Sequence, residues 1–139
     1  MAGSFTSTYK VTIGDINYGG HLGNDRALVI FQDARLVFLQ SFDASEKDIG
    51  DGCGIIMVES GIRYIREVFL HDELMVALTV TELRGKKFSL GYTVSRLSDG
   101  KKVLSGFTSF LSFNYDERRV AALPAAFEEK IAAYLHPKQ

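Results

Sequence analysis

Alternation of apolar and polar side chains recurs along most of this sequence and predicts an antiparallel sheet. A first β-rich run at 5–13 stops at Gly14, and four longer strand candidates follow Gly54. These candidates span residues 55–70, 73–83, 86–97 and 102–116. Turns that contain glycine separate the last three, as expected for antiparallel hairpins.

A long helix is predicted between the first strand and the others, over residues 24–42. Its apolar residues recur at spacings of three and four, but Val29 and Val37 make other faces apolar as well. Such a helix needs cover on nearly every side, which one curved sheet of five to six antiparallel strands wrapped around it would provide. Asn24 is the expected cap, and Asp25 places negative charge in the first turn.

Composition and charge narrow the class of protein. A shorter amphipathic helix at 123–135 closes the chain, so the sequence predicts one α+β domain over residues 1–139. A net charge of −1 argues against nucleic-acid or membrane-surface binding. Cys53 is the only cysteine, which excludes an internal disulfide and a cysteine-based zinc site, and the three histidines are scattered. Because no signal peptide or membrane-spanning run is evident, we expect a cytoplasmic protein without a metal.

The segment GDINYGGHLGND, residues 14–25, carries most of the candidate chemistry. Its four glycines let the backbone approach a ligand closely. Backbone N–H groups at the start of the following helix can stabilise negative charge that develops on a carbonyl oxygen. We expect Asp15 to fix the loop, and His21 and Asn17 to orient a water or a substrate through hydrogen bonds.

The order of elements and the residues DINYGGHLGN running into FQDAR resemble the hotdog-fold thioesterases of the 4-hydroxybenzoyl-CoA thioesterase group. That group shows the pattern D-x-D-x-x-G-H-V-N-N between its first strand and central helix. Its polar and glycine positions fall here on Asp15, Asn17, Gly20, His21 and Asn24. IRYIREVFLHDELMV, LRGKKFSLGYTV and SFNYDERRVAALP resemble further segments of the group. The resemblance implies a hotdog fold that hydrolyses an acyl-CoA or acyl-carrier-protein thioester to free acid and thiol, with no cofactor besides the coenzyme A of the substrate.

The chain departs from this group at Asn17, where the group carries its usual catalytic aspartate. An amide has no charge and takes up no proton at neutral pH, so it is neither nucleophile nor base. The candidate bases are therefore Asp25, one turn beyond His21, and Glu59, which the group's arrangement would bring from a neighbouring subunit.

Other roles remain open for residues near the helix start. The amides of Gly23 and Asn24 are candidates for polarising the thioester carbonyl. Asn24 also suits a cap, Asp25 a charge that stabilises the helix dipole, and Glu59 a solvent-facing strand position.

A basic hairpin is the second candidate site. Arg84, Lys86 and Lys87 lie within four residues, and coenzyme A carries a 3′-phosphate and a pyrophosphate that such cations would bind. A solvated turn would show the same charges. Because one curved sheet leaves its edge strands unpaired, we also expect a homodimer or a tetramer built from dimers.

Two alternatives to a thioesterase stay open. Hotdog hydratases carry a G-D-x-N-P-x-H stretch, and GDINYGGH shares four of those residue types but lacks the proline and places the histidine one position later. The other alternative is a hotdog protein that binds acyl-CoA without turning it over, because the usual catalytic carboxylate is absent.

Overall fold

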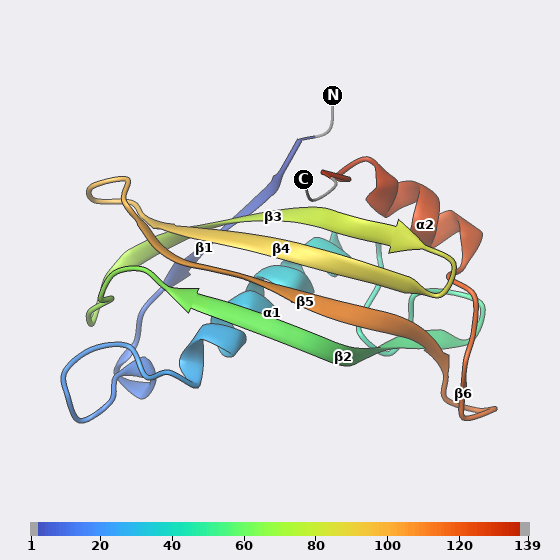
Figure 1. Cartoon of the computed structure of the whole chain (residues 1–139), viewed down its shortest axis with the longest axis horizontal. Helices are drawn as coiled ribbons and strands as arrows, with labels where there is room; N and C mark the ends of the chain where they lie inside the picture. Colours follow the sequence, from blue (N-terminus) through green and yellow to red (C-terminus); the bar gives the residue numbers. More distant parts are fainter. Residues whose placement is uncertain (1–2, 137–139) are drawn as a thin grey trace.

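The computed structural model of the protein describes residues 3–136. In chain order its elements are β1 (Phe5–Lys10), the 3₁₀ turn η1 (Ile13–Asp15), α1 (Arg26–Gln40), β2 (Cys53–Tyr64), β3 (Glu73–Arg84), β4 (Lys87–Arg96), β5 (Lys102–Asn114), β6 (Arg119–Val120) and α2 (Ala125–Ala132). All strand pairs are antiparallel, in the order β1-β3-β4-β5-β2, and the short β6 pairs with the end of β5. The predicted α+β class and single sheet are thus confirmed (Figure 1).

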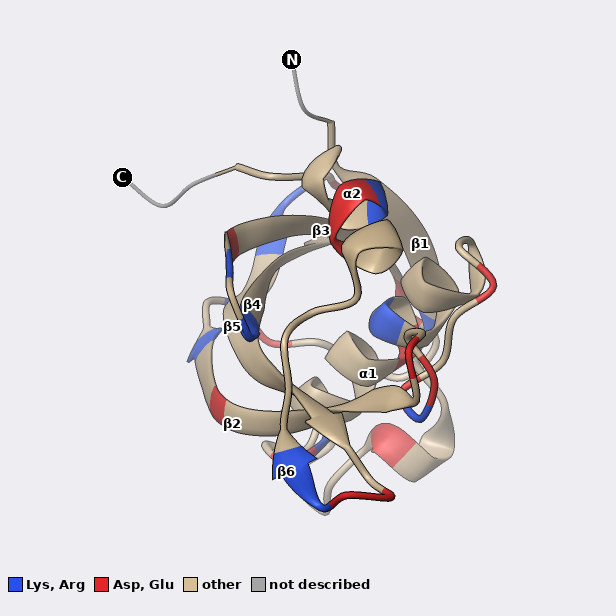
Figure 2. Ribbon diagram, turned by 90° about the vertical axis from the view of Figure 1, so that its right-hand side faces the viewer, with Lys and Arg blue, Asp and Glu red and all other residues tan. Residues whose placement is uncertain are grey.

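The sheet curls around α1, as the end-on view in Figure 2 shows. One face of the helix lies against the sheet, where the Phe31 ring stacks on Tyr92 with 4.3 Å between the ring centroids. Arg35 is buried in this interface, and its guanidinium donates to Glu46 and to the Tyr92 hydroxyl. Burial of this aromatic surface stabilises the packing of α1 on the sheet.

The other flank of α1 differs from the prediction that the helix is surrounded. Leu28, Leu36 and Val37 are 36%, 37% and 41% exposed. The sheet of one chain therefore covers the helix on one side and leaves an apolar flank open to solvent.

Two predicted boundaries shift. The helix starts at Arg26, and its cap position is Asp25 with no side-chain hydrogen bond, so the prediction that Asn24 caps it is wrong. The strand predicted at 55–70 ends at Tyr64, and the chain then leaves the sheet.

Within residues 3–136, neither α1 nor α2 has the length and apolar character needed to cross a membrane.

Candidate functional site

The loop before α1 is held in place by the buried carboxylate of Asp15. It accepts hydrogen bonds from the Tyr9 hydroxyl at 2.8 Å, the Thr12 amide at 2.9 Å and hydroxyl at 3.2 Å, and Arg26 Nε at 3.1 Å. Burial opposes ionisation of Asp15, but these hydrogen bonds outweigh it and hold its pKa below the usual value. Burial and the neighbouring Asp15 raise the pKa of Tyr9 to about 12. Asp15 thus has the structural role expected for it, and its carboxylate is buried among these contacts.

Asn17 forms part of a tight turn. Its side-chain oxygen accepts a hydrogen bond from the Gly19 backbone amide at 2.8 Å. Its backbone N–H donates to the His21 carbonyl at 2.9 Å, and its backbone carbonyl accepts from the Gly20 N–H at 3.1 Å. Gly20 has a φ of 86°, which only glycine adopts without strain. These contacts use the Asn17 side chain to shape the loop.

The start of α1 differs in one respect from the predicted oxyanion site. The Gly23 amide donates to the Asp15 carbonyl at 2.9 Å, so the prediction that this amide polarises a substrate carbonyl is wrong. The Asn24 amide has no acceptor among residues 3–136, and the Asn24 carbonyl accepts from the Tyr64 hydroxyl at 2.6 Å. Asp25 is exposed beside it at the helix cap.

A cavity of about 240 Å³ lies between this loop and the segment that follows β2. His21 and Asn24 line it from the loop, and Tyr64, Glu67 and Leu104 line it from the sheet side. The Leu22 amide donates to the Val68 carbonyl at 2.8 Å and joins the two segments. The cavity brings His21 and Asn24 together but includes neither Asn17 nor Asp25.

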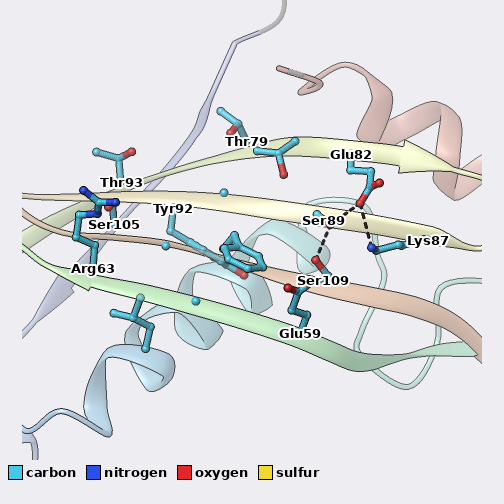
Figure 3. Close-up of a pocket in the computed structure, with 16 residues that line it drawn as sticks. Glu59, Arg63, Thr79, Glu82, Lys87, Ser89, Tyr92, Thr93, Ser105 and Ser109 are labelled. Atoms are coloured by element: carbon cyan, nitrogen blue, oxygen red, sulfur yellow. Dashed lines mark hydrogen bonds and ion pairs between the residues drawn. The ribbon is translucent and has the colours of Figure 1, made fainter. Parts of the chain in front are cut away.

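Glu59 lies on the opposite face of the sheet. A β-bulge between Met57 and Glu59 changes the alternation of β2, so Met57 pairs with Phe110 on the α1 side, whereas Glu59 pairs with Ser109 on the outer side. There Glu59 and Lys87 line a groove of about 1020 Å³ (Figure 3). Within one chain, the sheet separates Glu59 from the loop before α1.

The basic hairpin lies at the far end of the sheet from the loop, as Figure 1 shows. Lys87 pairs with Leu111 and Leu111 with Ile56, whereas the loop contacts Tyr64. Eight residues of strand separate Ile56 from Tyr64, or roughly 25 Å. One chain alone therefore does not join the two candidate sites.

Glu82 also lowers the positive charge that the sequence suggests for this hairpin. Its carboxylate lies 3.3 Å from Lys87 Nζ and 3.5 Å from Arg84 Nη2, and it accepts from the Ser89 hydroxyl at 3.1 Å. Burial opposes ionisation of Glu82, but Ser89 and Lys87 outweigh it and lower its pKa. The Lys86 side chain has no ion-pair partner among the described residues.

Tyr64, Glu67 and Glu82 are the neighbouring residues that sequence reasoning missed. Tyr64 and Glu67 fall inside one long predicted strand, so nothing in the sequence indicates that Glu67 has left the sheet and lies beside the loop. Glu82 could have been found from the sequence, because it is an acidic residue two positions before Arg84. Among residues 3–136, no group of His, Cys, Asp and Glu side chains could hold a metal ion.

Comparison with known proteins identifies the family. The sequence model of the thioesterase-like superfamily matches residues 11–131. The chain belongs to this superfamily. It is 23% identical over 111 residues to the long-chain acyl-CoA thioesterase FadM of Escherichia coli, covering 80% of this chain and 84% of FadM. It is 25% identical over 138 residues to a 1,4-dihydroxy-2-naphthoyl-CoA hydrolase of Synechocystis, covering 97% and 99%.

Solved structures agree with the fold of this superfamily member. A Synechocystis 1,4-dihydroxy-2-naphthoyl-CoA thioesterase superposes with a TM-score of 0.85 at 23% identity, covering 94% of this chain and 96% of that one. A Staphylococcus aureus protein solved in complex with CoA gives 0.86 at 26% identity, covering 96% and 85%. The predicted hotdog fold is thereby confirmed.

Proposed function

We propose that this protein hydrolyses acyl-CoA thioesters to a free acid and coenzyme A. Membership of the thioesterase-like superfamily supports the reaction class, and the two curated relatives are named as a thioesterase and a CoA-thioester hydrolase. The observation that carries the proposal is the cavity at the start of α1, lined by His21 and Asn24. These relatives favour thioester hydrolysis over the hydratase alternative.

The geometry of the loop supports the following roles for the site residues. The Asn24 amide, at the positive end of the α1 dipole, donates to the thioester oxygen and stabilises the charge that develops there. His21 orients the substrate or the attacking water by a hydrogen bond. Asn17 and Asp15 keep the loop in shape. Water is the nucleophile, because the Asp15 carboxylate is buried in hydrogen bonds and Asp25 lies outside the cavity.

We further propose that the working unit is a homodimer formed through β2. This edge strand exposes Ile56, Met57 and Val58 by 39%, 40% and 51%, and no strand among residues 3–136 pairs with its outer edge. Pairing β2 antiparallel with its copy would bring the loop of one chain to the same end as the basic hairpin of the other. Arg84, Lys86 and Lys87 would then bind the phosphates of coenzyme A, or the phosphopantetheine of a carrier protein.

A panel of aromatic and fatty acyl-CoAs, assayed with a thiol reagent, tests the activity. We expect release of free CoA from at least one substrate. Hydration of an enoyl-CoA, or saturable binding with no release of thiol, would contradict the proposal. Light scattering tests the assembly, and a monomer at micromolar concentration would contradict the dimer.

The role of the cavity is tested by His21→Ala. Loss of a hydrogen bond that positions the reacting groups should lower kcat by roughly a hundredfold. His136→Ala is the matched control, because His136 is exposed and lies outside the cavity. Equal rates for the two variants would remove His21 from the mechanism.

A further inference from the structure

The reaction needs a base, and the structure places the carboxylates near the loop in very different positions. Asp15 is buried, accepts four hydrogen bonds and does not line the cavity. Position 17 has no carboxylate, Asp25 lies outside the cavity, and Glu59 faces the other side of the sheet. Of the nine residues that line the cavity, Glu67 is the only carboxylate.

The backbone at Glu67 is held from two directions. The Val68 carbonyl accepts from the Leu22 amide, which fixes the segment against the loop. The Glu67 carbonyl accepts from the Arg96 guanidinium, which is held in turn by Asp72 at 3.3 Å and Asp99 at 2.9 Å. This exposed residue therefore has a well-defined main-chain position at the cavity.

The Glu67 side chain is available for chemistry. Within residues 3–136, its carboxylate takes part in no hydrogen bond or ion pair. Two arginines are nevertheless close, since Arg66 is adjacent in sequence and Arg96 contacts the Glu67 main chain. Arg66 donates instead to the Lys102 carbonyl at 2.7 Å. Both carboxylate oxygens of Glu67 are therefore open to a ligand in the cavity, unlike those of Asp15.

We propose that Glu67 is the general base of the hydrolysis, in place of the aspartate that is absent at position 17. This inference rests on the proposed thioesterase function. Glu67 accepts a proton from water as the water oxygen bonds to the thioester carbonyl carbon. The C–S bond of the tetrahedral intermediate then breaks, its electron pair leaves on the CoA sulfur, and the proton on Glu67 passes to that thiolate. The acid and the thiol are released, and Glu67 returns to its ionised form.

Glu67→Gln tests this role, because the change keeps the size of the side chain and leaves the main-chain contact with Arg96 in place. We expect kcat to fall by roughly a hundredfold or more, with KM nearly unchanged. The wild-type rate should fall at acidic pH as the base becomes protonated, and this acidic limb should be absent from the residual activity of the variant. Glu129→Gln, on the exposed surface of α2, is the matched control and should retain the wild-type rate and pH profile.

Replacing each of the two competing carboxylates, Asp25 and Glu59, by its amide completes the experiment. If Asp25→Asn or Glu59→Gln abolishes activity while Glu67→Gln retains it, the assignment of Glu67 is overturned and the thioesterase function stands. If the wild-type protein releases no CoA from any acyl-CoA, the proposed function fails, and the role of Glu67 fails with it. A circular dichroism spectrum and melting temperature equal to wild type would show that a loss of rate in Glu67→Gln is not a loss of fold.

Discussion

Asp15 in the loop before α1 and Glu82 beside the β3–β4 turn are both carboxylates paired with basic side chains, but their surroundings differ. Asp15, in η1, is 1% exposed and accepts from Tyr9 in β1, Thr12 before η1 and Arg26 at the start of α1, so it connects these elements. Glu82 is 33% exposed and contacts Arg84, Lys87 and Ser89 within a single hairpin. The ion pair of Asp15 with Arg26 holds separate elements together, whereas the ion pairs of Glu82 change only the local charge of one hairpin.

The difference shows how burial determines the effect of a similar ion pair. Exposed pairs such as Glu82 with Arg84 contribute from zero to about 1 kcal/mol, because water screens them and the side chains lose freedom. A buried carboxylate that accepts several hydrogen bonds contributes more, since its loss leaves donors without acceptors. We therefore expect substitutions in the loop to affect folding and kcat, and substitutions in the hairpin to affect KM.

The largest effect is expected from Asp15→Asn. The amide is neutral and cannot accept all four hydrogen bonds, so Arg26 and Thr12 lose part of their acceptor set. We expect a loss of about 2–3 kcal/mol in the free energy of unfolding at pH 7, together with lower kcat as the loop loses its anchor. Chemical denaturation measures the first and steady-state kinetics the second. Asp116→Asn, at an exposed turn position, is the control and should remain near wild type.

Acid should reduce the difference between Asp15→Asn and the wild type. The pKa of Asp15 is lower in the folded than in the unfolded chain, so its contribution is complete above the unfolded value near 4. It is lost as the pH falls through that value towards the folded pKa. The difference in melting temperature between wild type and Asp15→Asn should therefore be smaller at pH 3 than at pH 7. A constant difference at both pH values would contradict the role of the ionised carboxylate.

A smaller effect, confined to substrate binding, is expected when Arg84, Lys86 and Lys87 are all replaced by alanine. Phosphate contacts remote from the reacting carbon stabilise ground state and transition state alike, so KM should rise about tenfold at unchanged kcat. The salt dependence of KM should also weaken. Kinetics with a full-length CoA substrate at two salt concentrations measures both effects. An unchanged KM would return the hairpin to the role of a solvated turn.

The smallest effect is expected from Glu82→Gln, and it has the opposite sign. Removing this carboxylate leaves Arg84 and Lys87 without their nearest anion, so KM should fall about twofold, within the small range that exposed pairs provide. Glu117→Gln removes a surface ion pair with Arg119, away from the groove, and serves as the control. A rise in KM for Glu82→Gln would mean that this carboxylate positions the hairpin for binding.

The periodicity of the sequence predicts the sheet, the central helix and the hairpins well, because strand alternation and glycine turns depend on local residues. The face of Glu59 does not follow from that periodicity. Ile55 and Met57 face α1, and simple alternation places Glu59 on the same face. A bulge between Met57 and Glu59 reverses this parity, and nothing in the sequence around Val58 reveals it.

The candidate site shows a similar division. The loop sequence predicts that His21 and Asn24 lie together, since both are near a helix start. That the Gly23 amide is occupied depends on the path of the chain around Asp15, and the position of Glu67 depends on where β2 ends. Both depend on contacts between segments distant in sequence, which local residue types do not specify.

The location of the loop and the hairpin at opposite ends of the sheet has a genetic consequence for the proposed dimer. Each of the two sites would take its loop from one subunit and its hairpin from the other. A subunit with a defective loop and a subunit with a defective hairpin would therefore complement each other. Their mixed dimer would place both defects in one site and leave the second site intact, so a loop variant of low kcat and a hairpin variant of high KM expressed together would form dimers in which one site has the wild-type kcat and KM.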